Sequence, residues 1–399
     1  MLSHPWRISA SAALLGLGQN GLLVALPVLV ARFELTLAQW AGLIMAGSML
    51  FVVGSPFWGR VADRHGSRPV VIQALAGYIV SFMLIALVLW FSTAHDLPTP
   101  ALLAGLLIAR VVYGLSVSGM VPACQQWAVA LDAQAANGRG RVAALATVSA
   151  GLSTGRLLGP LVASASLTLS VYAPFVTMLL AGVLALLLVR GIANPAAGHV
   201  DPQPTARLPA PRNGVFLIQA LLLAMSVSLM QLGLPASLQA ALPITPERAS
   251  HLMGLLLSLG AAGALLAQLG VIRSRRLAWP ALLGIGGLAM TAGYALLVQA
   301  NDLGIFAMGV VVASIGAALA IPGYTAGSAV HQAQGVSAGY LAMAHTLGYA
   351  AATLWVASLA SERLLPLALG AAIAWLALVP LAWHLAARVA YRAEPARPR

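Results

Sequence analysis

The sequence predicts an all-α integral membrane protein whose twelve transmembrane helices form two pseudo-symmetric six-helix bundles. The 399-residue chain is 60% hydrophobic and only 8% charged. Soluble domains carry about 25% charged residues because their surface faces water, so most of this surface must face lipid. The apolar residues form twelve runs of membrane-spanning length, and the two halves carry similar motifs in the same order. Since lipid offers the backbone no hydrogen bonds, these runs must be helices.

Each predicted span meets the length that a bilayer imposes, about 20 apolar residues for a hydrocarbon core of roughly 30 Å. In chain order the spans are expected at residues 8–31, 38–58, 70–91, 101–124, 142–164, 171–190, 214–236, 250–271, 279–299, 304–327, 337–359 and 364–386. The first run starts near Ile8 and continues past signal-peptide length, so we expect it to remain in the protein.

A polar stretch, GIANPAAGHVDPQPTARLPAPRN, separates the two halves at residues 191–213. It is rich in Pro and Ala and shows no periodicity, which predicts a cytoplasmic linker. We therefore expect an N-terminal six-helix bundle at residues 1–190. The C-terminal six-helix bundle, with a short cytoplasmic tail, is expected at residues 214–399.

Similar segments in the two halves indicate a duplicated six-helix unit. Pro27 in the first span aligns with Pro235 in the seventh, and Pro122 in the fourth aligns with Pro322 in the tenth. Such repeats are typical of transporters in which two halves move about a site near the middle of the membrane.

The arginines predict the orientation of the chain. If the N-terminus is cytoplasmic, sixteen of the 21 basic residues lie in inner segments and three in outer loops. This bias is expected when both termini are inside, so we expect a multi-pass protein of a bacterial inner membrane. The net charge of +12 does not indicate nucleic-acid binding, because the arginines are scattered among loops and form no stripe.

The second inner loop carries a charged, glycine-containing motif, GRVADRHGSRPVV, at residues 59–71. It resembles the loop signature G-x-L-A-D-R-x-G-R-K of the major facilitator superfamily. The matching residues are Gly59, Ala62, Asp63, Arg64, Gly66 and Arg68. Arg110 and Gly114 in the fourth span resemble the R-x-x-x-G pattern of drug-exporting members. The G-x-x-x-G-P motif of antiporter members is matched in the fifth span by Gly155, Gly159 and Pro160.

This resemblance implies the fold of that family and a conformational latch at the second inner loop. In the family, the residue equivalent to Asp63 meets the start of the eleventh helix, which is expected near Gly335 here. The N-terminal end of a helix is positively polarised and stabilises a carboxylate. Asp132, at the inner end of the fourth span, is expected to pair with Arg64 or Arg68. The alternative is that this loop acts only as a topology signal.

Two arginines, Arg110 and Arg156, lie inside the fourth and fifth spans, about 13 Å and 12 Å deep at about 1.5 Å per residue. Each would cost roughly 3 kcal/mol if it faced lipid, so both should face the bundle interior. None of the nine acids falls in a span. The two guanidiniums therefore bond to backbone carbonyls, glutamines and water, or they bind a substrate that brings the negative charge. A guanidinium matches a carboxylate with two parallel hydrogen bonds, which favours a carboxylate-bearing substrate.

Further polar side chains in the spans are candidates to line a substrate site. They are Gln19, Asn20, Gln125, Gln231, Tyr294 and Tyr324. Single polar residues in spans also serve as contacts between helices, and this possibility stays open for each of them.

His345, in the eleventh span, is the titratable group expected at depth. An imidazole can change its charge near neutral pH, so His345 is the candidate for proton coupling, with Tyr349 one turn on as its candidate partner. Two different roles remain open. Either His345 is a buried residue whose hydrogen bonds serve packing alone, or the proton travels on the substrate's own carboxylate.

The leading functional hypothesis is a secondary active transporter that exports a small organic anion or amphiphile by alternating access. A carboxylate-type siderophore is one candidate substrate, and proton coupling is expected. A multidrug efflux pump for neutral or cationic compounds is the second hypothesis, although cationic drugs usually require a membrane acid. Two more hypotheses stay open, the uptake of an anion and a membrane receptor that transports nothing.

Several classes of protein are disfavoured by what the sequence omits. No cluster of His and acidic residues has metal-ligand spacing, so we expect no metal, no cofactor and no enzyme activity. The sequence has no phosphate-binding loop of the G-x-x-x-x-G-K type, which argues against ATP as the energy source. We expect a monomer whose partners are a small, anionic molecule, protons and the lipid bilayer.

Overall fold

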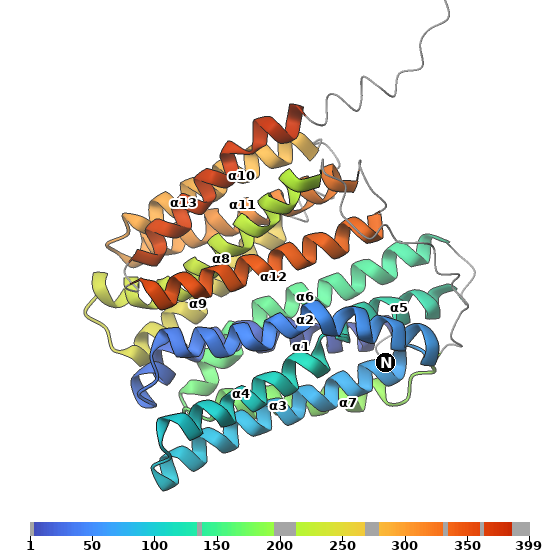
Figure 1. Ribbon diagram of the computed structural model, residues 1–399, viewed down its shortest axis with the longest axis horizontal. Helices are drawn as coiled ribbons and strands as arrows, with labels where there is room; N and C mark the ends of the chain where they lie inside the picture. The colour runs from blue at the N-terminus through green and yellow to red at the C-terminus, as the bar shows by residue number, and fades with distance from the viewer. Residues whose placement is uncertain are drawn as a thin grey trace, which may run out of the picture. The chain divides into compact units, whose positions relative to one another are not determined.

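The computed structural model describes residues 4–133, 138–194, 213–267, 279–329, 334–359 and 363–384, and these contain helices and loops but no strand (Figure 1). Contacts between residues divide the chain into two compact units. The first unit comprises residues 1–201 and 244–258, and the second comprises 202–243 and 259–399. Of the predicted linker, the structure describes residues 191–194 and residue 213, so the predicted domain boundaries stay predictions.

Seven of the described helices begin and end in the first unit, in the order α1 (His4–Arg32), α2 (Leu37–His65), α3 (Ser67–His95), α4 (Thr99–Val117), α5 (Met120–Ala133), α6 (Gly138–Leu167) and α7 (Ala173–Val189). The remaining described helices are α8 (Gly214–Ala241), α9 (Pro246–Ala267), α10 (Trp279–Val298), α11 (Leu303–Ala329), α12 (Gln334–Ser358) and α13 (Leu364–Ala377). The first residues of α9, up to Ser258, belong to the first unit.

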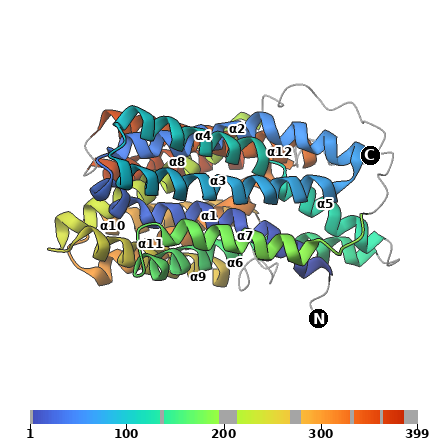
Figure 2. The same cartoon turned by 90° about the horizontal axis from the view of Figure 1, so that it is seen from below.

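Each predicted span coincides with helix in the described chain, which confirms the all-helical membrane fold. By length and composition, nine segments of the described chain are suited to cross a membrane, and α7 is a shorter apolar helix. Within the first unit, α1 packs against α6, and α3 packs against α4 and α7 (Figure 2). Within the second unit, α8 packs against α12 and α13, and α10 packs against α11.

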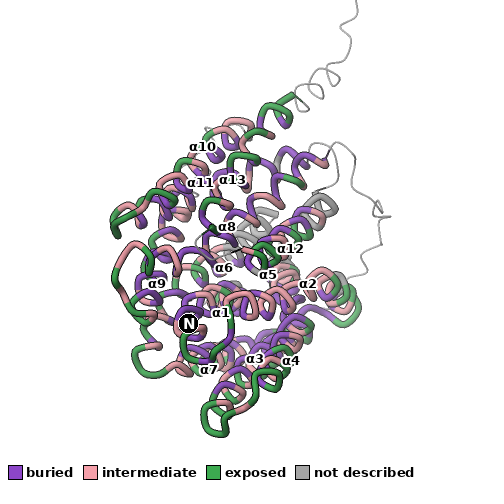
Figure 3. Tube along the Cα trace, turned by 60° about the vertical axis from the view of Figure 1, so that its left-hand side comes forward, coloured by how far each residue is buried: buried purple, intermediate pink, exposed green. Residues whose placement is uncertain are grey.

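Exposed apolar side chains identify the surfaces that face lipid. On α7, Leu180, Leu184 and Leu187 are each 59–60% exposed and recur at helical spacing along one side. Figure 3 shows buried and exposed positions alternating along the helices in the same way. A long stripe of large exposed leucines is unfavourable in water, whereas lipid tails accommodate it.

The fourth predicted span is divided into α4 and α5, and the break between them consists of Ser118 and Gly119. Pro122 has no backbone N–H, so the Ser118 carbonyl loses its usual partner one turn on. Ser55 of α2 donates to this carbonyl at 2.8 Å, and Trp58 Nε1 donates to the carbonyl of Leu115 at 2.5 Å. An unpaired carbonyl is costly in hydrocarbon, so these side chains of α2 stabilise the break. The fourth predicted span therefore lies within one membrane-spanning segment, Thr99–Ala128, whose helix is interrupted by this break.

Glycines bring α1 and α6 into backbone contact. Gly155 and Gly159 lie four residues apart on α6. A Cβ atom at Gly155 would collide with the backbone of Ala13 on α1, and one at Gly159 with the backbone of Leu17. Small residues at this spacing let transmembrane helices approach closely and gain van der Waals contact. These two residues of the predicted antiporter motif therefore pack α6 onto α1.

The second unit uses the same arrangement between α10 and α11. A Cβ atom at Gly293 would meet the backbone of Ala313, and one at Gly316 would meet the backbone of Met290. Both units therefore hold a pair of their helices together through small residues that allow their backbones to approach closely.

Candidate functional site

Arg156 lies in α6 beside α1, and its side chain is exposed. Gly16 of α1 makes room for it, because a Cβ atom there would lie 2.9 Å from Cγ of Arg156. Pro160 leaves the Arg156 carbonyl without an N–H from its own helix. Asn20 of α1 fills this place, since its Nδ2 donates to the carbonyl at 3.2 Å. Within the described part of the chain, the Arg156 guanidinium has no hydrogen bond or ion pair.

The other predicted substrate-binding residues of the spans are more dispersed. Gln19, next to Asn20, is exposed on α1, whereas Gln125 is half-buried in α5 beyond the break. Gln231 is half-buried in α8. The described hydrogen bonds therefore join Asn20 to the backbone of Arg156 and do not extend to these three glutamines.

The acidic residues keep away from the middle of the helices. Those in the described ranges are Glu34, Asp63, Asp96, Asp132, Glu247 and Asp302. Each lies in a loop or in the first or last turn of a helix. The structure does not describe the side chains of Asp63 and Asp132. In the ranges that are described, no carboxylate lies at the depth of Arg156.

Arg110 differs from Arg156 because α2 and α4 bury it. Its side chain is only 5% exposed, and its guanidinium carbon lies 4.5 Å from the centre of the Tyr113 ring. Gly47 of α2 makes this possible, since a Cβ atom there would lie 3.0 Å from a guanidinium nitrogen of Arg110. A cation over an aromatic ring is stabilised by the ring's electron-rich face. These contacts give Arg110 a packing role, and its predicted contact with substrate stays a prediction.

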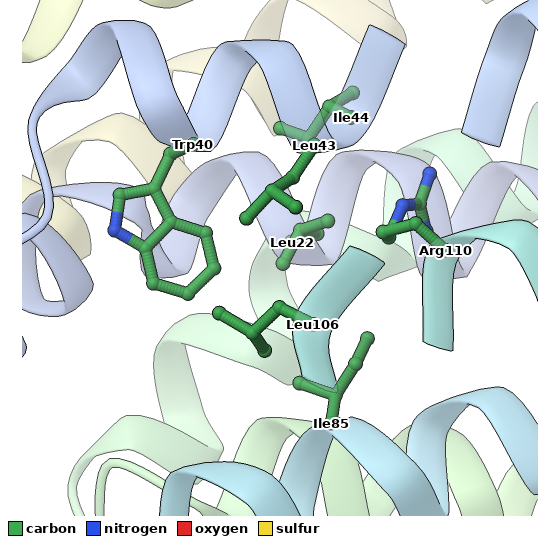
Figure 4. A pocket seen from close by; sticks show the side chains of 7 residues that line it. All are labelled: Leu22, Trp40, Leu43, Ile44, Ile85, Leu106 and Arg110. Atoms are coloured by element: carbon green, nitrogen blue, oxygen red, sulfur yellow. The ribbon is translucent and has the colours of Figure 1, made fainter. Parts of the chain in front are cut away.

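A small pocket lies beside Arg110 in the first unit (Figure 4). Its lining consists of Leu22, Trp40, Leu43, Ile44, Ile85, Leu106 and Arg110. In the close-up, the nitrogens of Arg110 lie at the far side of the pocket from Trp40. The surface that these side chains present to the pocket is apolar, so the pocket offers a small anion no polar group to bind.

The second unit places the predicted proton site in a polar cluster. Tyr324 of α11 and His345 of α12 are hydrogen-bonded, with 2.5 Å between the Tyr324 hydroxyl and Nε2. Their rings meet edge to face, with 5.8 Å between ring centres. Tyr294 of α10 is buried in the same unit. The hydrogen bond to Tyr324 joins His345 to a neighbouring helix, and the predicted contact of His345 with Tyr349 stays a prediction.

The predicted latch residues surround the turn between α2 and α3. Gly66 forms this turn with a φ of 87°, a conformation that favours glycine. Arg68 donates from its guanidinium to the Arg190 carbonyl, 2.6 Å away at the end of α7. Arg64 is exposed, and a Cβ atom at Gly59 would meet nothing within 4 Å. The expected contacts of Asp63, Asp132 and the start of α12 fall outside the described side chains.

Sequence reasoning missed two polar features of the first unit. His251 of α9 has its Nδ1 2.8 Å from the Ser164 hydroxyl of α6. Ser164 lies four residues after Pro160, the last residue of the matched antiporter motif, so the motif did not single it out. Asn194, at the end of the described part of the linker, bonds to both sides of the Gly66 turn. Its position in a Pro- and Ala-rich segment gave no signal of this role.

Comparison with known proteins gives one family match that covers most of the chain. The sequence profile described as Major Facilitator Superfamily matches residues 8–353. The chain is 30% identical over 168 residues to the multidrug resistance protein MdtG of Citrobacter koseri, covering 39% of this chain and 37% of that protein. It is 29% identical over 143 residues to MdtG of Klebsiella pneumoniae, covering 34% and 30%. The matches thus span about a third of the length of these relatives.

Solved structures match over nearly the whole chain. A bacterial homologue of the human lysosomal transporter Spinster, in an inward-facing and unoccupied conformation, has a TM-score of 0.71 and 15% identity over 100% of both chains. The human organic anion transporter MFSD10 has a TM-score of 0.63 and 19% identity, covering 96% of this chain and 100% of that one. At these identities the likeness concerns the fold alone.

Proposed function

This chain is a membrane transporter that belongs to the major facilitator superfamily, and we propose that it exports a small organic anion or amphiphile by alternating access. The observation that carries the proposal is Arg156. It is a cation in the middle of α6, its side chain is exposed, and the described residues supply no counter-ion. A carboxylate on the cargo would balance this charge during transport. A carboxylate-type siderophore is one substrate of this chemistry.

A cation at the depth of Arg156 is energetically costly in a membrane. An arginine facing lipid costs roughly 3 kcal/mol on insertion scales, so an interior position on the transport path is favoured. The Arg156 carbonyl already has Asn20 as its partner, and the side-chain amide of Asn20 is thereby engaged. The planar guanidinium can bind a carboxylate with two parallel hydrogen bonds, which gives it orientation as well as charge.

We further propose the direction, membrane and organisation of the transporter. Export follows from the resemblance of Gly155, Gly159 and Pro160 to the antiporter motif. A bacterial inner membrane with both termini in the cytoplasm follows from the arginine bias. Two six-helix bundles joined by the linker at residues 191–213 follow from the internal repeat, and they supply the two halves that alternating access requires.

Multidrug efflux of neutral or cationic compounds is the second candidate function. The names of the MdtG relatives favour it. The distribution of acids disfavours it, because the described helices hold no carboxylate in their central turns to bind a cation.

A flux assay with substrates matched in shape distinguishes these two functions. In proteoliposomes, we expect a tricarboxylate to be transported at least about tenfold faster than its neutral trimethyl ester, because only the carboxylate balances Arg156. A lipophilic cation is expected to remain near the rate of protein-free liposomes. Transport of the ester and the cation, with exclusion of the tricarboxylate, would establish drug efflux instead.

Proton coupling is proposed to use His345. We expect His345→Gln to abolish the stimulation of transport by an imposed pH gradient while downhill exchange of substrate continues. The reason is that glutamine keeps a hydrogen bond to Tyr324 but cannot change its charge near neutral pH. The measurement is substrate flux in proteoliposomes with and without the gradient. His384→Gln is the control, since His384 is exposed. A pH response that persists in His345→Gln would leave the substrate's own carboxylate as the proton carrier.

A further inference from the structure

Five hydrogen bonds hold the end of α7 and the segment that follows it, residues 188–194, to the rest of the first unit. They are Arg7 Nε to the Leu188 carbonyl (2.6 Å), the Arg68 guanidinium to the Arg190 carbonyl (2.6 Å), Trp127 Nε1 to the Ala193 carbonyl (2.8 Å), the Arg68 backbone N–H to Asn194 Oδ1 (3.3 Å) and Asn194 Nδ2 to the His65 carbonyl (3.3 Å). We call residues 188–194 the exit segment. Its donors and acceptors reach α1, α5 and both sides of the α2–α3 turn.

Asn194 occupies a special place among these contacts because it bridges the α2–α3 turn. Its amide donates to the carbonyl of His65, the last residue of α2, and accepts from the N–H of Arg68 near the start of α3. Only a side chain with both a donor and an acceptor can make this pair of bonds. The residue between the two helices is Gly66, so Asn194 closes the turn from outside.

The shape of the turn also fits Asn194. Gly66 has a φ of 87°, which side-chain-bearing residues rarely adopt. A Cβ atom on Gly66 would lie 2.5–2.9 Å from the side-chain atoms of Asn194. The glycine is thus required twice, once by its backbone angle and once because the Asn194 amide lies directly against it.

Arg68 links the same turn to the end of α7. Its backbone N–H bonds to Asn194 and its guanidinium bonds to the Arg190 carbonyl. A cation at the C-terminal end of a helix is favoured by the helix dipole and by the unpaired carbonyls there. Arg68 therefore bonds to the exit segment at Arg190, and Asn194 of the exit segment bonds back to the turn.

We propose that Asn194 is a positioning residue of the transport cycle, which fixes the α2–α3 turn and anchors the first residues of the connection to the second half of the chain. The inference rests on transport as such and not on the charge of the substrate. With Asn194 in place, the turn keeps one geometry, and the connection is tethered as far as residue 194. Without it, both hydrogen bonds of residue 194 to the turn are lost, and the bond from the Arg68 guanidinium to the Arg190 carbonyl remains to join the turn to the exit segment.

Two readouts test this proposal, and transport is measured with whichever compound of the flux assay the wild type carries. We expect Asn194→Ala to lower the turnover per folded molecule about fivefold or more with KM little changed, because two hydrogen bonds that position the turn are lost. Trypsin cleavage after Arg190 is expected to accelerate as the exit segment is released. Asn194→Asp keeps the acceptor for Arg68 and loses the donor to His65, so an intermediate effect is expected.

Trp127→Phe is the matched control, because it removes the bond to the Ala193 carbonyl without touching the turn. We expect it to retain turnover per folded molecule. Unchanged turnover in Asn194→Ala, or an equal loss in Trp127→Phe, would overturn the role assigned to Asn194. If Asn194→Ala fails to fold, Asn194→Asp carries the test, and wild-type turnover and cleavage in that variant would also overturn it. Transport of a cation by the wild type would refute the proposed anion while leaving this test valid.

Discussion

Arg156→Gln is expected to remove most transport of the proposed anionic substrate. Hydrogen bonds to charged groups contribute about 1.5–3 kcal/mol, so kcat/KM should fall roughly 10- to 100-fold. Glutamine has a similar reach and remains polar, and the carbonyl of residue 156 keeps its bond to Asn20 because that bond involves the backbone. The measurement is carboxylate flux in proteoliposomes, normalised to folded protein.

Two further variants separate charge from packing. Arg156→Lys keeps the charge but loses the planar fork, so its activity should lie between those of the wild type and Arg156→Gln. Arg110→Gln is expected to lower thermal stability rather than substrate affinity, since the guanidinium of Arg110 is buried over the Tyr113 ring. Wild-type flux in a normally inserted Arg156→Gln would contradict the anionic substrate.

Arg156 and Arg110 show why depth in the membrane alone does not define a binding residue. The sequence puts both guanidiniums at similar depth, but Gly47 of α2 leaves room for the guanidinium of Arg110 on α4. Arg156 instead passes Gly16 and stays exposed. One cation therefore lies against an aromatic ring of its own unit, whereas the other is exposed and is the one we propose to bind the substrate.

The helices could be predicted from the sequence because each depends on local information, the length of an apolar run. The break between α4 and α5 could not. Several spans contain a proline, which lacks a backbone N–H as Pro122 does. Whether a helix breaks at its proline depends on the hydrogen-bond partners that the freed carbonyls find. Here those partners are Ser55 and Trp58 on α2, about sixty residues away in the chain.

The candidate site could likewise be predicted only where it depends on local features of the sequence. The positions of the charged residues in the sequence are enough to single out Arg156 and to show that no acid lies in a predicted span. The hydrogen bond between His345 and Tyr324 could not be predicted, because it joins α12 to α11 and helical spacing within one span cannot reveal it. Asn194 was equally hidden, since the turn that it closes lies far away in the sequence. Contacts between helices decide these details.

The second large effect is expected from Gly155→Ala, a change of one methyl group. The added Cβ would collide with the carbonyl group and Cα of Ala13 on α1. These are backbone atoms, so no side-chain rotation can relieve the contact and α1 must move as a whole. Overpacking of this kind costs typically about 1–3 kcal/mol. We expect a clear fall in thermal stability in detergent and in folded yield.

Gly42→Ala is the control that isolates the collision. A Cβ atom at Gly42 of α2 would meet nothing within 4 Å. Alanine is intrinsically more favourable than glycine in a helix by about 1 kcal/mol, so stability should stay the same or rise. Both substitutions add the same methyl group to a transmembrane helix, and only the partner helix differs. If Gly155→Ala melted at or above the wild-type temperature, α1 and α6 could not be packed through their backbones, and the placement of Asn20 beside Arg156 would fail with them.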